Sequence, residues 1–196
     1  MTDYFALLDQ PRRPWLDQDA LKQAFHQKSL TEHPDAQASG GSVSEAEATF
    51  AVLNEAHQTL QDPKRRLQHL LALEGHGQTA RFSSVPNDIA DLFPAIAEAT
   101  QDAERVTGKA GGATTALGRS LLASELGQVR DRLESLIGRL ASLEAEADSE
   151  LRRISEAFDE HDPETASTLE RLYVRYSFLQ RWVAQLNEHF ARLNSL

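Results

Sequence analysis

Cysteine is absent from the 196 residues of this chain. The protein therefore has no disulfide, no thiolate nucleophile and no cysteine ligand for zinc or an iron–sulfur cluster. Long apolar runs are missing too, since none approaches the roughly 18–20 residues that span a bilayer. The start of the chain carries an acid at Asp3 and lacks the apolar core of a signal peptide. We expect a cytoplasmic protein that makes no contact with membranes.

Basic residues are scarce, with 20 Lys and Arg against 30 Asp and Glu and a formal net charge of −10. This balance argues against a nucleic-acid partner, because such binding depends on neutralising phosphates. The sequence also lacks a Gly-x-Ser-x-Gly motif and a phosphate-binding glycine loop. Its seven histidines include no His-x-x-x-His or Glu-x-x-His pair for a metal. We expect no enzymatic activity, no metal and no cofactor.

What the sequence does contain is helical patterning, which predicts an all-α protein. Tyr4 to Leu8 form a short apolar start. Asp17 can cap a second helix that runs to about Glu32, where Pro34 stops it.

Two further helices are expected before residue 77. Ser44 and Glu47 form a capping-box signature for the first of them. His57 falls on its apolar face, so we expect this histidine to be packed in the core. Asp62-Pro63 supplies an N-cap and a first helical residue for the next helix, which we expect to end at Gly75 or Gly77.

The C-terminal part is patterned as one helix followed by a long helical hairpin. We expect the single helix to begin near Asp91, and the Gly- and Thr-rich residues 107–118 to form a loop. Two heptad seams follow, separated by a turn at Asp162-Pro163, and they predict an antiparallel pair about 60 Å long. The seams are Leu126, Val129, Leu133, Leu136, Leu140 and Leu143, and Leu169, Leu172, Tyr176, Leu179, Val183, Leu186, Phe190 and Leu193.

His33-Pro34-Asp35 is the most informative tripeptide in the chain. It lies just past one predicted helix, and a second helix folds back about ten residues later. Asn54 to Leu60, Asp62-Pro63 and Arg65-Arg66 then follow. This combination resembles a J-domain, a helical hairpin with a His-Pro-Asp loop, in which the aspartate accepts hydrogen bonds from a partner arginine. On the residues alone, a simple turn with a helix-stopping proline stays an alternative.

The likeness continues beyond the J-domain and narrows the family. Asp3 to Leu8, Leu67 to Gly75 and the segment around Phe178 are similar to the HscB family. The resemblance covers residues 1–106 and 121–196. It implies a J-domain at 1–77, a linker at 78–90 and, at 91–196, a C-terminal three-helix bundle built on the hairpin.

The family resemblance also implies partners. An HscB-like protein stimulates the ATPase of a DnaK/HscA-class chaperone and delivers an IscU-type scaffold protein to it during iron–sulfur cluster assembly. The residues expected to bind the chaperone are His33, Pro34, Asp35, Lys22 and Lys28. Those expected to bind the scaffold are Leu92, Phe93, Ile96 and Phe178. We expect the protein itself to act as a monomer.

A second apolar stripe supports a client surface independently of the resemblance. Val174, Phe178 and Trp182 recur at every fourth position, offset from the heptad seam. We expect Val174 and Trp182 to receive the helix at 91–106. Phe178, with Leu92 and Phe93, is expected to face a partner, because the last two lie at a helix start that can fray.

The chain departs from the family pattern in ways that keep two alternatives open. J-domains usually have a basic second helix, a tyrosine before His-Pro-Asp and a lysine after it. Here that helix carries only Lys22 and Lys28, Glu32 precedes the motif and Ala36 follows it. The alternatives are a general J-domain co-chaperone with a different client, and a coiled-coil interaction protein with a degenerate J-domain.

Overall fold

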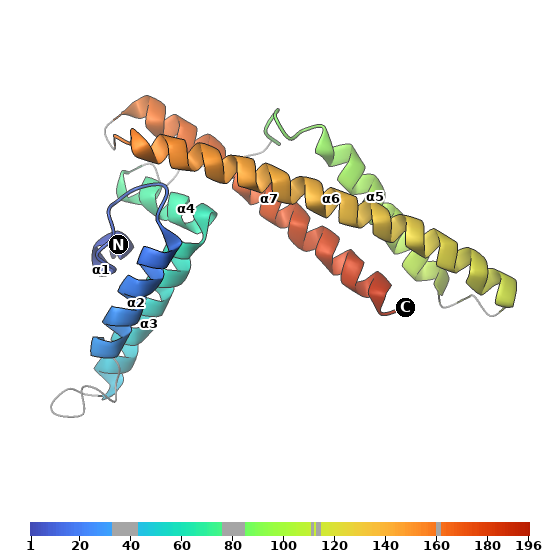
Figure 1. Ribbon diagram of the computed structural model, residues 1–196, viewed down its shortest axis with the longest axis horizontal. Coiled ribbons are helices and arrows are strands. Elements are labelled where there is room, and N and C mark those ends of the chain that lie inside the picture. Colours follow the sequence, from blue (N-terminus) through green and yellow to red (C-terminus); the bar gives the residue numbers. More distant parts are fainter. Residues whose placement is uncertain (33–42, 76–84, 111, 113–114, 160–161) are drawn as a thin grey trace. The chain divides into compact units, whose positions relative to one another are not determined.

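The computed structural model describes residues 1–32, 43–75, 85–110, 112, 115–159 and 162–196, and all regular structure in these ranges is helical (Figure 1). The order of the helices agrees with the order predicted from sequence. The helices are α1 (Tyr4–Leu7), α2 (Gln18–Glu32), α3 (Val43–Gln61), α4 (Pro63–Leu73), α5 (Leu92–Ala110), α6 (Ala116–Glu156) and α7 (Pro163–Asn194).

The chain divides into two compact units. Unit 1 combines Met1–Arg81 with Asp148–Tyr173, and unit 2 combines Phe82–Ala147 with Val174–Leu196. Each unit therefore takes in part of α6 and part of α7. The first unit holds α1 to α4, and the second holds α5.

Aspartate side chains cap the N-termini of α2, α4 and α7 by accepting hydrogen bonds from nearby backbone N–H groups. The Asp17 carboxylate accepts a bond from the Ala20 N–H at 2.9 Å, and Asp62 accepts one from Arg65 N–H at 2.8 Å. Asp162 caps α7 by accepting from Glu164 N–H at 3.1 Å. These caps satisfy amides that the first helical turn leaves unpaired. All three predicted helix starts are confirmed, whereas α3 begins at Val43, one residue before its predicted N-cap Ser44.

In unit 1, α2 and α3 run side by side in opposite directions (Figure 1). The Phe25 and His57 rings stack between them with centroids 4.3 Å apart, and His57 is half-buried, as expected from its position on the apolar face. Burial lowers the His57 pKa, because the charged imidazolium loses its hydration. The fully buried apolar residues around these helices are Phe5, Leu8, Leu21, Ala56, Leu60, Leu67 and Leu70.

A buried arginine ties three segments of unit 1 together. Arg66 of α4 is only 1 % exposed. Its Nε donates to the Pro14 carbonyl at 2.7 Å, and one terminal nitrogen donates to the Leu60 carbonyl at 2.5 Å. The first bond holds the segment before α2, and the second holds the end of α3. Burial of a charge is stable only where such partners compensate its lost hydration.

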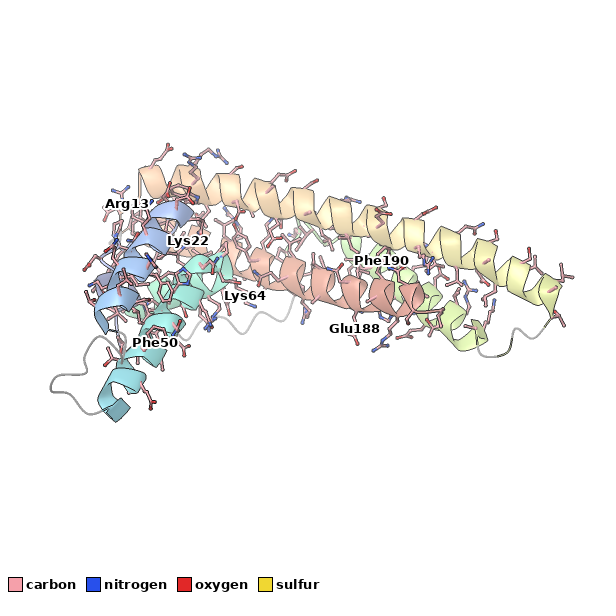
Figure 2. All side chains as sticks on the ribbon, turned by 60° about the horizontal axis from the view of Figure 1, so that its bottom comes forward. Arg13, Lys22, Phe50, Lys64, Glu188 and Phe190 are labelled. Carbon is pink, nitrogen blue, oxygen red and sulfur yellow. The ribbon has the colours of Figure 1, made fainter. Side chains whose placement is uncertain are left out.

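The core of unit 2 forms along the predicted heptad seams. Leu133, Leu140, Leu179 and Leu186 are buried, and Phe190, labelled in Figure 2, packs against them from α7. Helix α5 adds a stripe of core residues at helical spacing. That stripe is Leu92, Ile96, Ala99, Ala103 and Val106.

The second apolar stripe of α7 is buried at two of its three positions. Val174 and Trp182 are both only 4 % exposed, and Trp182 belongs to the same core cluster as the α5 stripe. Phe178 keeps part of its surface accessible. Trp182 therefore packs within unit 2, as expected, and the partly accessible Phe178 also packs against this core cluster.

The predicted loop at 107–118 is largely wrong. Helix α5 continues to Ala110 and α6 already begins at Ala116. Lys109 pairs with Glu125 of α6 at 3.1 Å, and Thr107 donates its hydroxyl proton to the Ala103 carbonyl at 2.8 Å. These contacts outweigh the weak helix propensity of glycine and threonine. Of the predicted linker, residues 85–90 are described, and Ile89 among them is fully buried in unit 2.

Candidate functional surfaces

The His33-Pro34-Asp35 motif lies outside the described residues. It falls in the interval between the end of α2 at Glu32 and the start of α3 at Val43. The described helices flanking it form the antiparallel pair that a hairpin with a connecting loop requires. The roles expected of the three motif residues remain predictions.

Lys22 and Lys28 differ in their availability to a partner. Lys22 is exposed on α2 (Figure 2). Lys28 is half-buried and pairs with Asp9 at 2.8 Å. Because Asp9 offsets the Lys28 charge, Lys22 is the more accessible positive group of the two. The two lysines are six residues apart, so they lie on different sides of the helix.

The exposed side of α2 also carries an apolar residue that the sequence reasoning missed. Lys22, His26 and Leu30 follow one another at intervals of four and therefore share a face. Leu30 is 57 % exposed, although leucine is usually buried. The sequence could have indicated this exposure, because helical spacing places Leu30 on a different side of the helix from Leu21 and Phe25.

Of the four apolar residues expected to bind the scaffold, two are not accessible on the surface of unit 2. Leu92 is 1 % exposed and Ile96 is 3 % exposed, so both belong to the core. Phe93 is 55 % exposed and Phe178 is half-buried. Leu92 and Ile96 fall on the inward stripe of α5, whereas Phe93 lies about 100° away around the helix.

The start of α5 is held by ion pairs to both of the other helices of unit 2. Asp91 pairs with Arg139 of α6 at 2.7 Å. Asp88 lies 3.5 Å from Arg175 of α7. Between these two acids, Ile89 is fully buried. This anchoring holds Leu92 inside and presents Phe93 from a fixed first turn.

Register brings Phe93 and Phe178 level with each other. Gln185 of α7 donates a hydrogen bond to the Thr100 hydroxyl of α5 at 3.3 Å, across a sequence separation of 85 residues. Phe93 and Phe178 each precede this pair by two helical turns, and they have the same separation. The two helices run in the same direction within unit 2 (Figure 1). The accessible surface formed by Phe93 and Phe178 is called the aromatic surface below.

Two neighbouring side chains of α7, Trp182 and Arg181, contact the Phe178 ring of the aromatic surface. The Phe178 and Trp182 rings are tilted by 52° with centroids 5.5 Å apart. The Arg181 guanidinium carbon lies 4.7 Å from the centroid of the Phe178 ring. Sequence reasoning did not identify Arg181, although a cation three residues after an exposed aromatic could have indicated it.

The described ranges contain neither a cluster of metal ligands nor a membrane-spanning helix. Within them, no three His, Asp or Glu side chains gather closely enough to hold a metal ion. No helix in the same ranges is sufficiently long and apolar to cross a bilayer.

Comparison with known proteins agrees with this architecture. Residues 3–69 match the family model of the DnaJ domain. The chain is similar to the solved structure of chaperone HscB from Vibrio cholerae, with 21 % identity, 95 % of this chain and 96 % of that chain covered, and a TM-score of 0.52. It is also similar to the human co-chaperone protein HscB, with 15 % identity, 95 % and 81 % covered, and a TM-score of 0.56.

The N-terminal part of the chain is thus a DnaJ domain. Over 95 % of its length the chain has the fold of the HscB co-chaperones, with a helical C-terminal region after that domain. The predicted fold class and the resemblance to HscB are confirmed.

Proposed function

We propose that this protein is a co-chaperone that stimulates the ATPase of a DnaK/HscA-class chaperone and delivers an IscU-type scaffold protein to it. The observation that carries the proposal is the combination in one chain of a DnaJ domain with the HscB fold. A DnaJ domain supplies the contact with an ATP-dependent chaperone. The remaining helices supply a second, separate surface for a client.

The chaperone contact would involve α2 and the motif that follows it. Asp35 would accept hydrogen bonds from an arginine of the chaperone, and Pro34 would limit the conformations of the chain beside it. Lys22 would steer association towards an acidic surface, while Lys28 would contribute less because Asp9 offsets its charge. Leu30 adds an accessible apolar group on the Lys22 side of the helix.

The client contact would be the aromatic surface of unit 2. Phe93 is the most exposed of the four residues expected to bind the scaffold, and Phe178 is partly accessible. Leu92 and Ile96 would act indirectly, because they fix the helix that presents Phe93. Large apolar side chains at the centre of an interface often contribute most of its binding energy.

Two contacts on one chain would couple client binding to ATP hydrolysis. A scaffold held on unit 2 would be present at high effective concentration when the DnaJ domain binds the chaperone. Hydrolysis would then close the chaperone on the scaffold. Such coupling requires the chain to bind both partners at once, and not that it perform any chemistry itself.

Steady-state ATPase rates of the chaperone test this proposal with and without the scaffold. The wild-type protein should raise the rate alone, and raise it further when the scaffold is present. The Phe93→Ala variant should keep the first effect and lose the second. Leu117→Ala is the matched control, because Leu117 is 71 % exposed at the far end of unit 2, where α6 begins.

Other outcomes separate the alternative functions. Stimulation of the ATPase without any binding of the scaffold would indicate a general co-chaperone with a different client. Scaffold binding without stimulation would indicate an interaction protein whose DnaJ domain is inactive. Absence of both ATPase stimulation and scaffold binding would contradict the proposal as a whole.

A further inference from the structure

Among the side chains that the structure describes, every arginine of unit 2 but one forms an ion pair or a hydrogen bond to a backbone carbonyl. Arg132 pairs with Glu98 at 2.6 Å, and Arg139 pairs with Asp91 at 2.7 Å. Arg130 donates to the Leu193 carbonyl at 2.5 Å. The others in this group are Arg105 with Asp102 and Glu125, Arg175 with Asp88 and Glu146, and Arg192 with Glu188.

Arg181 is the exception. It is exposed on α7, and its guanidinium lies over the Phe178 ring rather than beside a carboxylate. The residues three and four positions away on its own helix are Phe178, Ala184, Ser177 and Gln185, none of which is acidic. Within the described ranges of unit 2, Arg181 therefore forms no ion pair.

The facing helix does not offer an acid at this level either. The register that aligns Thr100 with Gln185 places Arg181 level with Ile96, whose chain neighbours Ala95 and Ala97 carry no charge. The nearest acid along α5, Glu98, is already paired with Arg132 of α6. The Arg181 guanidinium is thus a localised positive group at the edge of the aromatic surface, in a chain of net charge −10.

We propose that Arg181 binds a carboxylate of the client protein, beside the apolar contact that Phe93 and Phe178 make. This inference rests on the proposed client function and adds the chemistry of the group that must face Arg181. The guanidinium presents a planar fork of donors that matches a carboxylate in two parallel hydrogen bonds. The Phe178 ring limits the orientations of that fork, so less conformational freedom is lost on binding.

The occupant that fits this arrangement is a scaffold protein with an apolar patch bordered by an Asp or Glu. A basic border would be repelled by Arg181, and a neutral border would leave its charge without a partner in the interface. Arg181 is therefore expected to select among clients that all possess an apolar patch.

Titration calorimetry of the full-length protein with the IscU-type scaffold tests the proposal. Arg181→Gln should weaken binding about tenfold, as expected when a charge-assisted hydrogen bond is lost. Arg181→Glu should weaken it further, because it places two acids together. Arg192→Gln is the matched control, since Arg192 is exposed on the same helix but already paired with Glu188. The control should retain wild-type affinity.

A structural role for Arg181 is distinguished from a client contact in two ways. Thermal unfolding of Arg181→Gln should match the wild type, whereas loss of packing under Phe178 would lower the midpoint. Increasing salt should weaken wild-type binding more than it weakens binding by Arg181→Gln, because only the former retains the ion pair. An Asp→Arg or Glu→Arg substitution in the scaffold that restores binding to Arg181→Glu would identify the carboxylate.

The outcomes also separate this inference from the function on which it rests. If the wild type binds, Phe93→Ala weakens binding and Arg181→Gln does not, the Arg181 contact is overturned while the client surface stands. If the wild-type protein fails to bind the scaffold, the proposed client function is overturned, and the Arg181 contact with it.

Discussion

The backbone N–H of Tyr4 donates a hydrogen bond to Nε2 of His69 at 3.1 Å. The same imidazole stacks on the Tyr4 ring at a centroid distance of 4.5 Å. Because Nε2 acts as the acceptor, the ring must be neutral, with its proton on Nδ1. This contact joins α1 to α4 across 65 residues of sequence.

The first prediction follows from the protonation of His69. Burial lowers the His69 pKa below its usual value of 6.5, Asp3 opposes this shift and Arg12 adds to it. On acidification the unfolded chain therefore takes up this proton before the folded chain does. The His69 contribution to the free energy of unfolding should be complete above about pH 6.5 and should decrease as the pH falls below that value.

Chemical denaturation between pH 7.5 and pH 5.5 measures this effect. His69→Gln keeps a side-chain acceptor near Tyr4 but cannot titrate, so its stability should decline less across the interval than that of the wild type. Equal declines in the two proteins would contradict the assignment.

The second prediction concerns the buried guanidinium of Arg66. Arg66→Lys preserves the charge but removes the fork that reaches both the Pro14 and Leu60 carbonyls. We expect the free energy of unfolding to fall by about 2–3 kcal/mol. Denaturant melts measure it, with Arg65→Lys as the neighbouring control. Arg65 pairs with Glu55 at 3.3 Å near the surface, so its loss should cost less than about 1 kcal/mol. Similar costs at the two positions would refute the structural role of Arg66.

The third prediction contrasts two consecutive residues of α5. Leu92→Ala should reduce stability by about 2–5 kcal/mol, because Leu92 is 1 % exposed in the core. Phe93→Ala should cost much less stability, because its side chain is largely in solvent. Scaffold affinity should instead fall by about 2 kcal/mol for Phe93→Ala. Calorimetry beside a denaturant melt of each variant separates the two effects. A Phe93→Ala variant that loses stability but binds normally would show that Phe93 is a packing residue only.

Short-range patterns in the sequence predicted the helices well. Asp17, Asp62 and Asp162 mark helix starts because each cap depends on residues two or three positions away. The heptad seams predicted the core for a similar reason, since helical periodicity alone decides which side chains share a face. The DnaJ resemblance rested on a motif of the same local kind.

Features that depend on distant residues were less accessible from the sequence. Leu92 was expected at a fraying helix end. The pairing of Asp91 with Arg139, which holds this helix start, could not be predicted because the two residues are 48 positions apart. The helical extension to Ala110 similarly depends on Lys109 meeting Glu125 on another helix. Arg66 was taken only as part of a motif, although its burial fixes three segments. In each case, a tertiary contact outweighed the local preference.

The fourth prediction is the most direct test of the central claim, that the DnaJ domain stimulates a DnaK-class ATPase. The measurement is the steady-state ATPase rate of the chaperone with wild-type protein and with Asp35→Asn. The substitution keeps the size of the side chain and removes the negative charge proposed to meet an arginine of the chaperone. We expect the wild type to stimulate hydrolysis and Asp35→Asn to abolish that stimulation, with helicity and thermal unfolding unchanged. Equal stimulation by the two proteins would contradict the account.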